Sequence, residues 1–201
     1  MKGAFRGIIF DLDGVLVDSY ECWYALVNDA LKLTGRPPAT KAEFDATWGQ
    51  GPDADQASFF PNWNVDQILR YYDDHFADYA KNVRVMDGAA DTLAALRSKG
   101  LLLAVASNSP RKIVEVLLQH AKLLDYFESI VGFDEVAHGK PEPDLILHVL
   151  EHWQMDRSDA FYVGDSPFDA EAAKNAEIFF VGFRRPGDAT ISQLAQLSDF
   201  V

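Results

Sequence analysis

Apolar positions in this chain alternate between short continuous runs and longer stretches with helical spacing. Residues 7–10 form the first continuous run, which is typical of a strand buried on both faces of a parallel sheet. Further runs of this kind lie at 101–106, 129–133, 160–163 and 178–181. Strands that alternate with helices along the chain favour a doubly wound parallel sheet, so we predict an α/β fold.

Apolar residues three and four positions apart predict the helices between these strands. The predicted helices of this part span residues 87–99, 110–121, 145–153, 167–176 and a short stretch near 190–197. Ser109-Pro110 and Ser166-Pro167 each have the pattern of an N-cap followed by a first-turn proline.

The segment between the first two strands has a different pattern, because it holds helical spacing and no strand-like run. One helix is predicted after Ser19, with Asp18 and Ser19 as its cap, and another at 65–79. One or two short helices are expected between 39 and 64. We therefore expect a catalytic core formed by residues 1–17 and 83–201, and a small all-helical domain formed by residues 18–82.

Composition and net charge limit the classes of binding partner that we expect for this chain. The 201 residues are 48% hydrophobic and 24% charged, as in an ordinary soluble globular protein. The net charge is −13, and no run of Lys or Arg could neutralise a phosphate backbone, so we expect no nucleic-acid partner. No apolar stretch is long enough for a membrane span, and residues 1–6 show no signal-peptide pattern. The single cysteine, Cys22, suits a reducing compartment, so a cytoplasmic monomer or homodimer is expected.

Charged and polar residues that could act in one binding site follow several of the predicted strands. They are Asp11 and Asp13 after the first, Ser107 and Asn108 after the second, Lys140 in the loop before a helix, and Asp165, Ser166 and Asp169 after the fourth. Because parallel strands end at one edge of the sheet, these groups are expected to share one pocket. Carboxylates, an ammonium, a hydroxyl and helix N-termini together suit a divalent metal ion and a phosphoryl group.

Each motif also has a plainer interpretation when it is taken alone. Asp11 and Asp13 could be solvated loop acids, Ser107-Asn108 a turn, and Lys140 a surface lysine. Ser166 with Asp169 also fits a capping box. An EF-hand is excluded, because glycine falls at the fourth loop position and Cys22 at the twelfth.

Four motifs taken together resemble the haloacid dehalogenase (HAD) superfamily. They are Asp11-Leu12-Asp13-Gly14-Val15-Leu16-Val17-Asp18-Ser19, Ala106-Ser107-Asn108-Ser109, Lys140-Pro141-Glu142-Pro143 and Gly164-Asp165-Ser166-Pro167-Phe168-Asp169. Their order and spacing are similar to the branch of phosphoglycolate phosphatase and β-phosphoglucomutase. The resemblance implies a Rossmann-like core with a helical cap domain inserted after the first strand.

The resemblance also implies roles for individual residues. Asp11 is expected to be the nucleophile and Asp13 the general acid and base, with Lys140 offsetting negative charge. Mg²⁺ is expected on Asp11, Asp13 and Asp165. The phosphoryl oxygens are assigned to Ser107, Lys140 and backbone N–H groups near Leu12 and Asn108, and the supporting residues are Asp169, Gly14 and Ser166.

These roles imply a Mg²⁺-dependent phosphatase that acts on a small phosphorylated metabolite through an aspartyl-phosphate. The presence of Asp13 favours phosphate esters over carbon–halogen bonds, because dehalogenation needs no general acid there. A phosphosugar mutase and a non-catalytic phosphate-ligand binding protein remain alternatives. The candidate specificity residues of the cap are Tyr20, Trp23, Trp48, Gln50, Arg70 and Lys81.

Overall fold

The computed structural model describes residues 5–201, so the first four residues of the expected core segment and of the N-terminus lie outside the described residues. Within that range, the main sheet has six strands in the order β5-β4-β1-β6-β7-β8, and every neighbouring pair is parallel. The strands are β1 (Gly7–Phe10), β4 (Leu102–Ala106), β5 (Ser129–Val131), β6 (Ala160–Gly164), β7 (Phe179–Phe183) and β8 (Ala189–Ile191). The predicted doubly wound α/β fold is confirmed.

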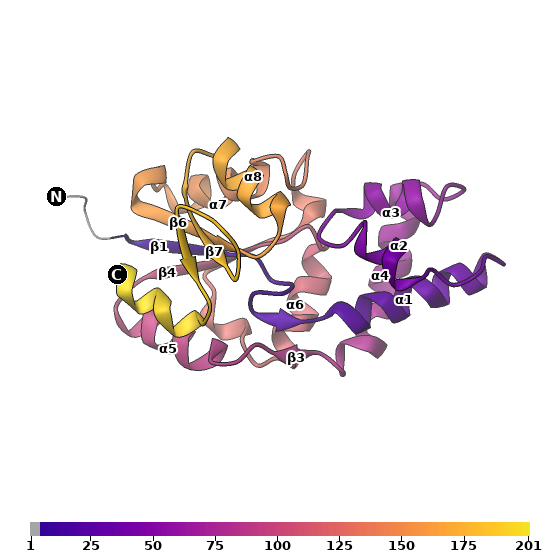
Figure 1. Ribbon diagram of the computed structural model, residues 1–201, viewed down its shortest axis with the longest axis horizontal. Coiled ribbons are helices and arrows are strands. Elements are labelled where there is room, and N and C mark those ends of the chain that lie inside the picture. Colours follow the sequence, from indigo (N-terminus) through magenta and orange to yellow (C-terminus); the bar gives the residue numbers. More distant parts are fainter. Residues whose placement is uncertain (1–4) are drawn as a thin grey trace.

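Helices cover both faces of the sheet, as Figure 1 shows. These helices are α5 (Ala89–Ser98), α6 (Arg111–His120), α7 (Asp144–Trp153) and α8 (Pro167–Asn175). Short 3₁₀ turns lie at Leu124–Tyr126, Phe133–Glu135 and Arg157–Asp159, and a longer 3₁₀ helix at Leu194–Phe200 follows the last strand. Alternate β1 residues point to opposite faces: Ile8 packs in the core cluster with α5 and α6, and Ile9 in the cluster with α7 and α8. This two-sided burial explains why the strands are continuously apolar.

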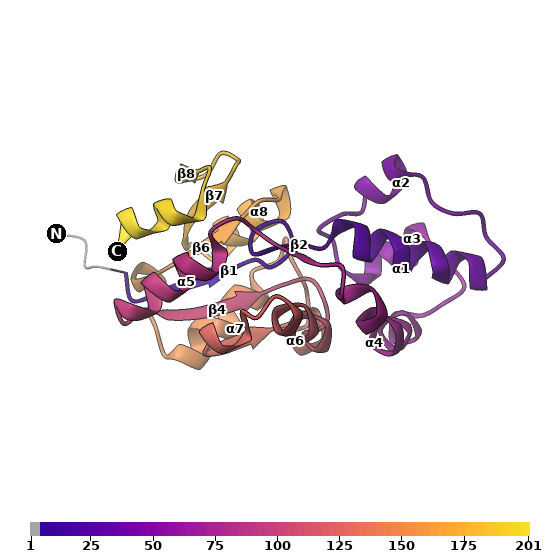
Figure 2. The same ribbon diagram turned by 90° about the horizontal axis from the view of Figure 1, so that it is seen from below.

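A separate group of helices lies beyond the carboxyl ends of the strands, at one end of the elongated molecule (Figure 1, Figure 2). It contains α1 (Tyr20–Leu33), α2 (Lys41–Asp45), α3 (Pro52–Ser58) and α4 (Val65–Ala80). Its core is aromatic: Trp23 meets Tyr72 and Phe76, with ring centroids 5.2 and 4.5 Å away. The helical segment packs around these rings, and its buried residues form one continuous core with the side of the sheet that α5 and α6 cover.

The chain enters and leaves this helical unit through a two-stranded antiparallel ribbon. Its strands are β2 (Val17–Asp18) and β3 (Arg84–Val85), with Val17 opposite Val85. The Asp18 carboxylate accepts a hydrogen bond from the Arg84 guanidinium. The expected domain boundaries at 17/18 and 82/83 fall within or beside this ribbon.

Several local predictions differ from the structure. The third strand was expected to extend to residue 133, but β5 ends at Val131 and a 3₁₀ turn follows. The stretch near 190–197 was expected to be one short helix, yet β8 ends at Ile191 and a 3₁₀ helix begins at Leu194. The β2–β3 ribbon was not predicted, because two-residue strands have no measurable periodicity. Among residues 5–201, no helix has the length and apolar character that crossing a membrane requires.

Candidate functional site

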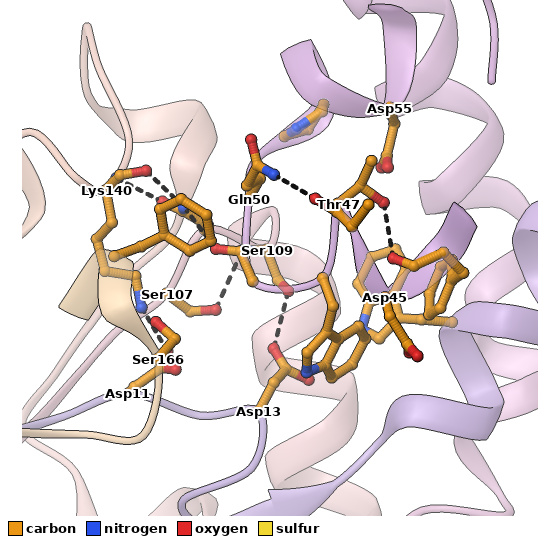
Figure 3. A pocket seen from close by; sticks show the side chains of 18 of the residues that line it. Asp11, Asp13, Asp45, Thr47, Gln50, Asp55, Ser107, Ser109, Lys140 and Ser166 are labelled. Carbon is orange, nitrogen blue, oxygen red and sulfur yellow. Dashed lines mark hydrogen bonds and ion pairs between the residues drawn. The ribbon is translucent and has the colours of Figure 1, made fainter. Parts of the chain in front are cut away.

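The sheet topology brings the expected groups to one edge. β4 and β6 flank β1, and Phe10 pairs with Val105 on one side and Val163 on the other. Asp11, Ser107 and Asp165 directly follow these three strands and therefore lie side by side at the edge of the sheet. Figure 3 shows Asp11, Ser107 and Lys140 on the same side of one pocket. These convergent positions are what the strand-end pattern predicted.

A buried ion-pair network joins the first strand to the loop before α7. The Lys140 Nζ donates hydrogen bonds to Asp11 Oδ1 and Asp169 Oδ1, both at 2.7 Å. Asp11, Lys140 and Asp169 are only 6%, 5% and 0% exposed. The Tyr162 hydroxyl also donates to Asp169 Oδ1, at 2.7 Å, and lies 3.1 Å from Lys140 Nζ. Lys140 is therefore held by two carboxylates and is not a surface lysine.

Burial and charge shift the pKa values of these groups in different directions. Burial raises the pKa of Asp11 well above its ordinary value, and the neighbouring carboxylate of Asp169 raises it further. Burial opposes the charge on Lys140, but Asp11 and Asp169 more than offset this effect and raise its pKa. Burial also opposes ionisation of Asp169, yet Lys140 and the hydrogen bonds that Asp169 accepts leave its pKa lowered. Lys140 is thus a fixed cation.

Asp13 projects into the same pocket and accepts two serine hydroxyls. Ser19 donates to its Oδ1, and Ser109 donates to its Oδ2 at 3.1 Å. Burial raises the pKa of the Asp13 carboxyl. Ser19 occupies the predicted N-cap position of α1 but makes no side-chain cap bond, and Asp18 pairs with Arg84. The N-cap predicted at Ser109 is wrong, because Pro110 occupies the N-cap of α6. These serine side chains orient Asp13 instead.

Asn108 connects the core to the helical unit. Its side-chain Oδ1 accepts the Lys140 backbone N–H at 2.7 Å, and its Nδ2 lies 3.0 Å from the carbonyl oxygens of both Lys140 and Gly49. No described residue accepts a hydrogen bond from the backbone N–H of Leu12 or Asn108. These two N–H groups therefore remain available to an anion.

Three carboxylates lie close enough to share a cation. Atoms of Asp11, Asp165 and Asp169 all lie within 4.8 Å of one another. Asp169 is already engaged by Lys140, Tyr162 and Ser166, with which it closes the predicted capping box. Burial raises the pKa of Asp165 to about 7. Asp11 and Asp165 are hard oxygen donors in a partly buried site, which fits Mg²⁺.

Gly14 is required by this arrangement. Its φ is +83°, and a Cβ there would lie 2.1 Å from Asp165 Oδ2. Glycine lets the loop after β1 approach Asp165 closely.

The site opens into a cavity of about 450 Å³ between the sheet edge and the helical unit. Trp23, Trp48 and Gln50 line it, as expected of specificity residues. Tyr20, Arg70 and Lys81 do not; Tyr20 donates its hydroxyl to Asp45, and the other two side chains are exposed. The structure therefore brings together the core motifs and half of the proposed cap residues.

Residues missed in the sequence also shape the site. Tyr162 lies in a continuous apolar run, so nothing in the pattern distinguishes its hydroxyl from a packing aromatic. Asp55 lines the cavity from α3, and the Tyr72 hydroxyl donates to it at 2.7 Å. Only the tertiary packing of the helical unit reveals that Asp55 faces the pocket.

The amino-acid sequence matches a known protein family and several known relatives. Residues 8–183 match the family model described as haloacid dehalogenase-like hydrolase. The chain is 33% identical to a phosphoglycolate phosphatase of Pseudomonas putida over 186 residues, covering 88% of this chain and 68% of the relative. It is also 33% identical to the phosphoglycolate phosphatase of Escherichia coli, with 88% and 80% covered.

Solved structures share the fold. A HAD-superfamily hydrolase of subfamily IA from Geobacter sulfurreducens superposes with a TM-score of 0.83 at 22% identity, covering 98% of this chain and 100% of that one. CbbY from Rhodobacter sphaeroides, solved with xylulose-(1,5)bisphosphate, gives a TM-score of 0.84 at 21% identity, with 96% of both chains covered. At these identities the likeness concerns the fold alone.

Proposed function

The chain belongs to the haloacid dehalogenase-like hydrolase family, and on this premise we propose that it is a phosphatase that hydrolyses a small phosphomonoester. The observation that carries the proposal is the buried Asp11–Lys140 pair, which lines the cavity together with Asp13 and Asp165. Phosphate monoesters hydrolyse slowly without catalysis, so a nucleophile, a proton donor and fixed positive charge are all needed.

In the first step, Asp11 attacks phosphorus. Lys140 holds Oδ1 of Asp11, which leaves Oδ2 to form the new bond. The bond between phosphorus and the ester oxygen breaks, and the product is an aspartyl-phosphate on Asp11. Lys140 offsets the charge that accumulates when the phosphoryl group approaches the carboxylate.

Asp13 moves the protons in both steps. We assign proton donation to the departing alkoxide to Asp13, because burial raises the pKa of its carboxyl, which is the direction that favours a proton donor. The resulting carboxylate then takes a proton from the water that attacks the aspartyl-phosphate. Inorganic phosphate leaves, and Asp11 and Asp13 return to their starting states. Ser19 and Ser109 hold Asp13 in orientation through both steps.

The phosphoryl oxygens are assigned to donors at the ends of β1 and β4. The Ser107 side chain lines the cavity, and the backbone N–H groups of Leu12 and Asn108 have no acceptor among the described residues. Such fixed donors stabilise the transferring group without reorganisation. Asn108 and Asp169 are positioning residues, because they hold the backbone and the ammonium of Lys140.

A divalent cation is part of the proposal. The Asp11 carboxylate, the Asp13 backbone carbonyl and Asp165 would hold Mg²⁺, which when bound supplies charge that lowers the repulsion between Asp11 and the phosphate. Burial raises the pKa of Asp165 to about 7 and Asp169 raises it further, while Lys140 opposes the shift; a bound cation would favour the carboxylate.

We assign residues 18–82 to a cap that selects the substrate, and the remaining residues to the catalytic core. The cap supplies one wall of the cavity, while the core supplies the reacting groups. The β2–β3 ribbon, at the junction, would serve as the hinge. The single buried Cys22 is consistent with a cytoplasmic location.

The test is release of inorganic phosphate from a panel of small phosphate esters in the presence of Mg²⁺. Asp11→Asn should reduce kcat by at least about 10³-fold, because an amide is a poor nucleophile. Asp125→Asn, which changes an exposed acid outside the cavity lining, is the matched control and should keep full activity. EDTA should abolish phosphate release, and added Mg²⁺ should restore it. Full activity of Asp11→Asn would refute the assignment of the nucleophile.

A further inference from the structure

Residues of the segment 18–82 form one wall of the cavity, which we call the distal wall, and no described Lys or Arg lies on it. The segment 18–82 has five basic residues, which are Lys32, Arg36, Lys41, Arg70 and Lys81. Among the described residues that line the cavity, none of these five appears, and Lys140 is the only Lys or Arg. Lys140 belongs to the phosphate end, where Asp11 and Asp169 already engage it.

The basic residues of the cap are held away from the cavity by local geometry. Arg70 lies two positions from both Ile68 and Tyr72, which are buried on the inner face of α4, so it lies on the opposite face of the helix. The Arg36 guanidinium donates to the Phe59 carbonyl. A movement of the cap as a rigid unit would change neither position.

Other basic residues near the cap have acidic partners. Lys41 pairs with Glu21 at 2.7 Å. Across the boundary, Lys112 of the core lies 3.7 Å from Asp73 on α4. Neither lysine lines the cavity. A second anion on a substrate would therefore find no counter-charge on the distal wall.

The charged groups on the distal wall are carboxylates. Asp55 is half-buried, and its Oδ2 accepts the Tyr72 hydroxyl at 2.7 Å, while no described residue donates to its Oδ1. Asp45 accepts the Tyr20 hydroxyl at 2.6 Å. Figure 3 shows Asp45 and Asp55 on the side of the pocket opposite Asp11 and Lys140. The free Asp55 oxygen is an acceptor that needs a donor from the substrate.

Aromatic rings surround these acids. Trp23, Phe44, Trp48 and Tyr72 line the same cavity, and Tyr72 contacts Asp55 directly. Apolar walls with a few fixed polar groups are typical of pockets that orient an organic ligand. The cavity of about 450 Å³ also leaves room for a ring-sized group beyond the phosphate.

We propose that this cavity selects phosphomonoesters whose alcohol portion carries no second anion and offers a hydroxyl donor to Asp55. The inference rests on the proposed phosphatase function and defines its substrate class. An ester with a carboxylate at the far end would lie against Asp55 and Asp45 without a cation to offset the repulsion. A second phosphate would meet the same wall, so a bisphosphate is disfavoured too.

The experiment compares two ester pairs that differ only in the distal group. The first pair is 5-hydroxypentyl phosphate and 5-phosphooxypentanoate, which are long enough to extend beyond the phosphate end, and the second is glucose 1-phosphate and glucuronic acid 1-phosphate. With the full chain at pH 8 and saturating Mg²⁺, kcat/KM should be on the order of 100-fold higher for the alcohol in each pair. Equal values, or a preference for the acids, would overturn the proposal.

Substitution of the distal carboxylate assigns the effect to a residue. Asp55→Asn keeps an acceptor for Tyr72 and removes the charge, so it should reduce the preference for the alcohol by about tenfold or more. Asp53→Asn changes an exposed acid on the same helix that does not line the cavity, and should leave the preference unchanged. A preference that Asp55→Asn leaves intact would contradict the role of Asp55.

A binding measurement separates this inference from the proposed function. Calorimetry of the four esters with the Asp11→Asn variant reports affinity without turnover. Tighter binding of the alcohols, with no hydrolysis by the parent protein, would support the selectivity and refute the phosphatase. Phosphate release from both acids at least as fast as from the alcohols would support the phosphatase and refute the selectivity.

Discussion

The ionisation of Asp55 is coupled to folding, so the pH dependence of stability tests whether its carboxyl is buried as the structure shows. The carboxyl sits on α3 against Tyr72 and has no cationic partner among the described residues. Burial raises its pKa from 3.8 to about 7. Asp55→Asn preserves the size and the acceptor for the Tyr72 hydroxyl but cannot ionise. The variant therefore isolates the free-energy cost of keeping a negative charge at this position.

The magnitude follows from the two pKa values. Below pH 4 the carboxyl is protonated in both folded and unfolded chains, so ionisation contributes nothing. Between pH 4 and 7 the unfolded chain ionises while the folded chain does not, so the stability of the parent falls as pH rises. A pKa difference of about 3 corresponds to a loss of about 4 kcal/mol by pH 8. Above pH 7 both states are ionised and the loss is constant.

The assay is urea unfolding at pH 4.5, 6 and 8, with parent and variant in matched buffers. We expect the stability of Asp55→Asn relative to the parent to increase by about 3 kcal/mol from pH 4.5 to 8. Asp53→Asn is the control, because its exposed side chain should show no comparable trend. A difference between Asp55→Asn and the parent that stays constant with pH would show that the buried carboxyl ionises normally and would refute the reasoning.

Two further substitutions test the core. Lys140→Met leaves the buried carboxylates of Asp11 and Asp169 without their cation. Near neutral pH it should therefore lower the free energy of unfolding by about 3–5 kcal/mol and kcat by at least about 10²-fold. A melting temperature and a phosphate-release rate equal to those of the parent would contradict this expectation. Gly14→Ala places a Cβ 2.1 Å from Asp165 Oδ2 at a φ of +83°, and should cost about 1–2 kcal/mol in backbone strain and weaken Mg²⁺ activation. Thermal unfolding followed by circular dichroism measures the loss of stability, and the phosphate-release rate as a function of Mg²⁺ concentration measures the activation. An unchanged half-saturating Mg²⁺ concentration would show that Asp165 is not displaced.

The order of strands and helices was predictable because long elements leave a strong periodic pattern. β1 and β6 are fully buried, so their apolar runs are unbroken. The convergence of Asp11, Ser107 and Asp165 followed from the rule that parallel strands end at one edge. The same logic could not detect β2 and β3, because two-residue strands depend on pairing between distant parts of the chain.

The side-chain partners in the site were less predictable. Ser109 precedes a proline at a helix start, which is the local pattern of an N-cap, yet its hydroxyl reaches Asp13 across 96 residues of sequence. Asn108 was expected to be near the phosphate, and the structure shows that its side chain is used to hold Lys140 and Gly49. Arg70 and Lys81 were among the candidate specificity residues, but both are exposed and outside the cavity lining, because a residue's type does not reveal which face of a helix it occupies.

The β2–β3 ribbon has a consequence for how such chains diversify. Val17 and Val85 are paired neighbours, although the whole of α1 to α4 lies between them. Paired residues on antiparallel strands lie about 5 Å apart, so two or three glycines could bridge the junction if the intervening helices were excised. The two chain ends at the junction would then keep nearly the same positions relative to the main sheet. A lineage could thus exchange the whole helical unit through one pair of splice points and keep the sheet with its strand-end residues.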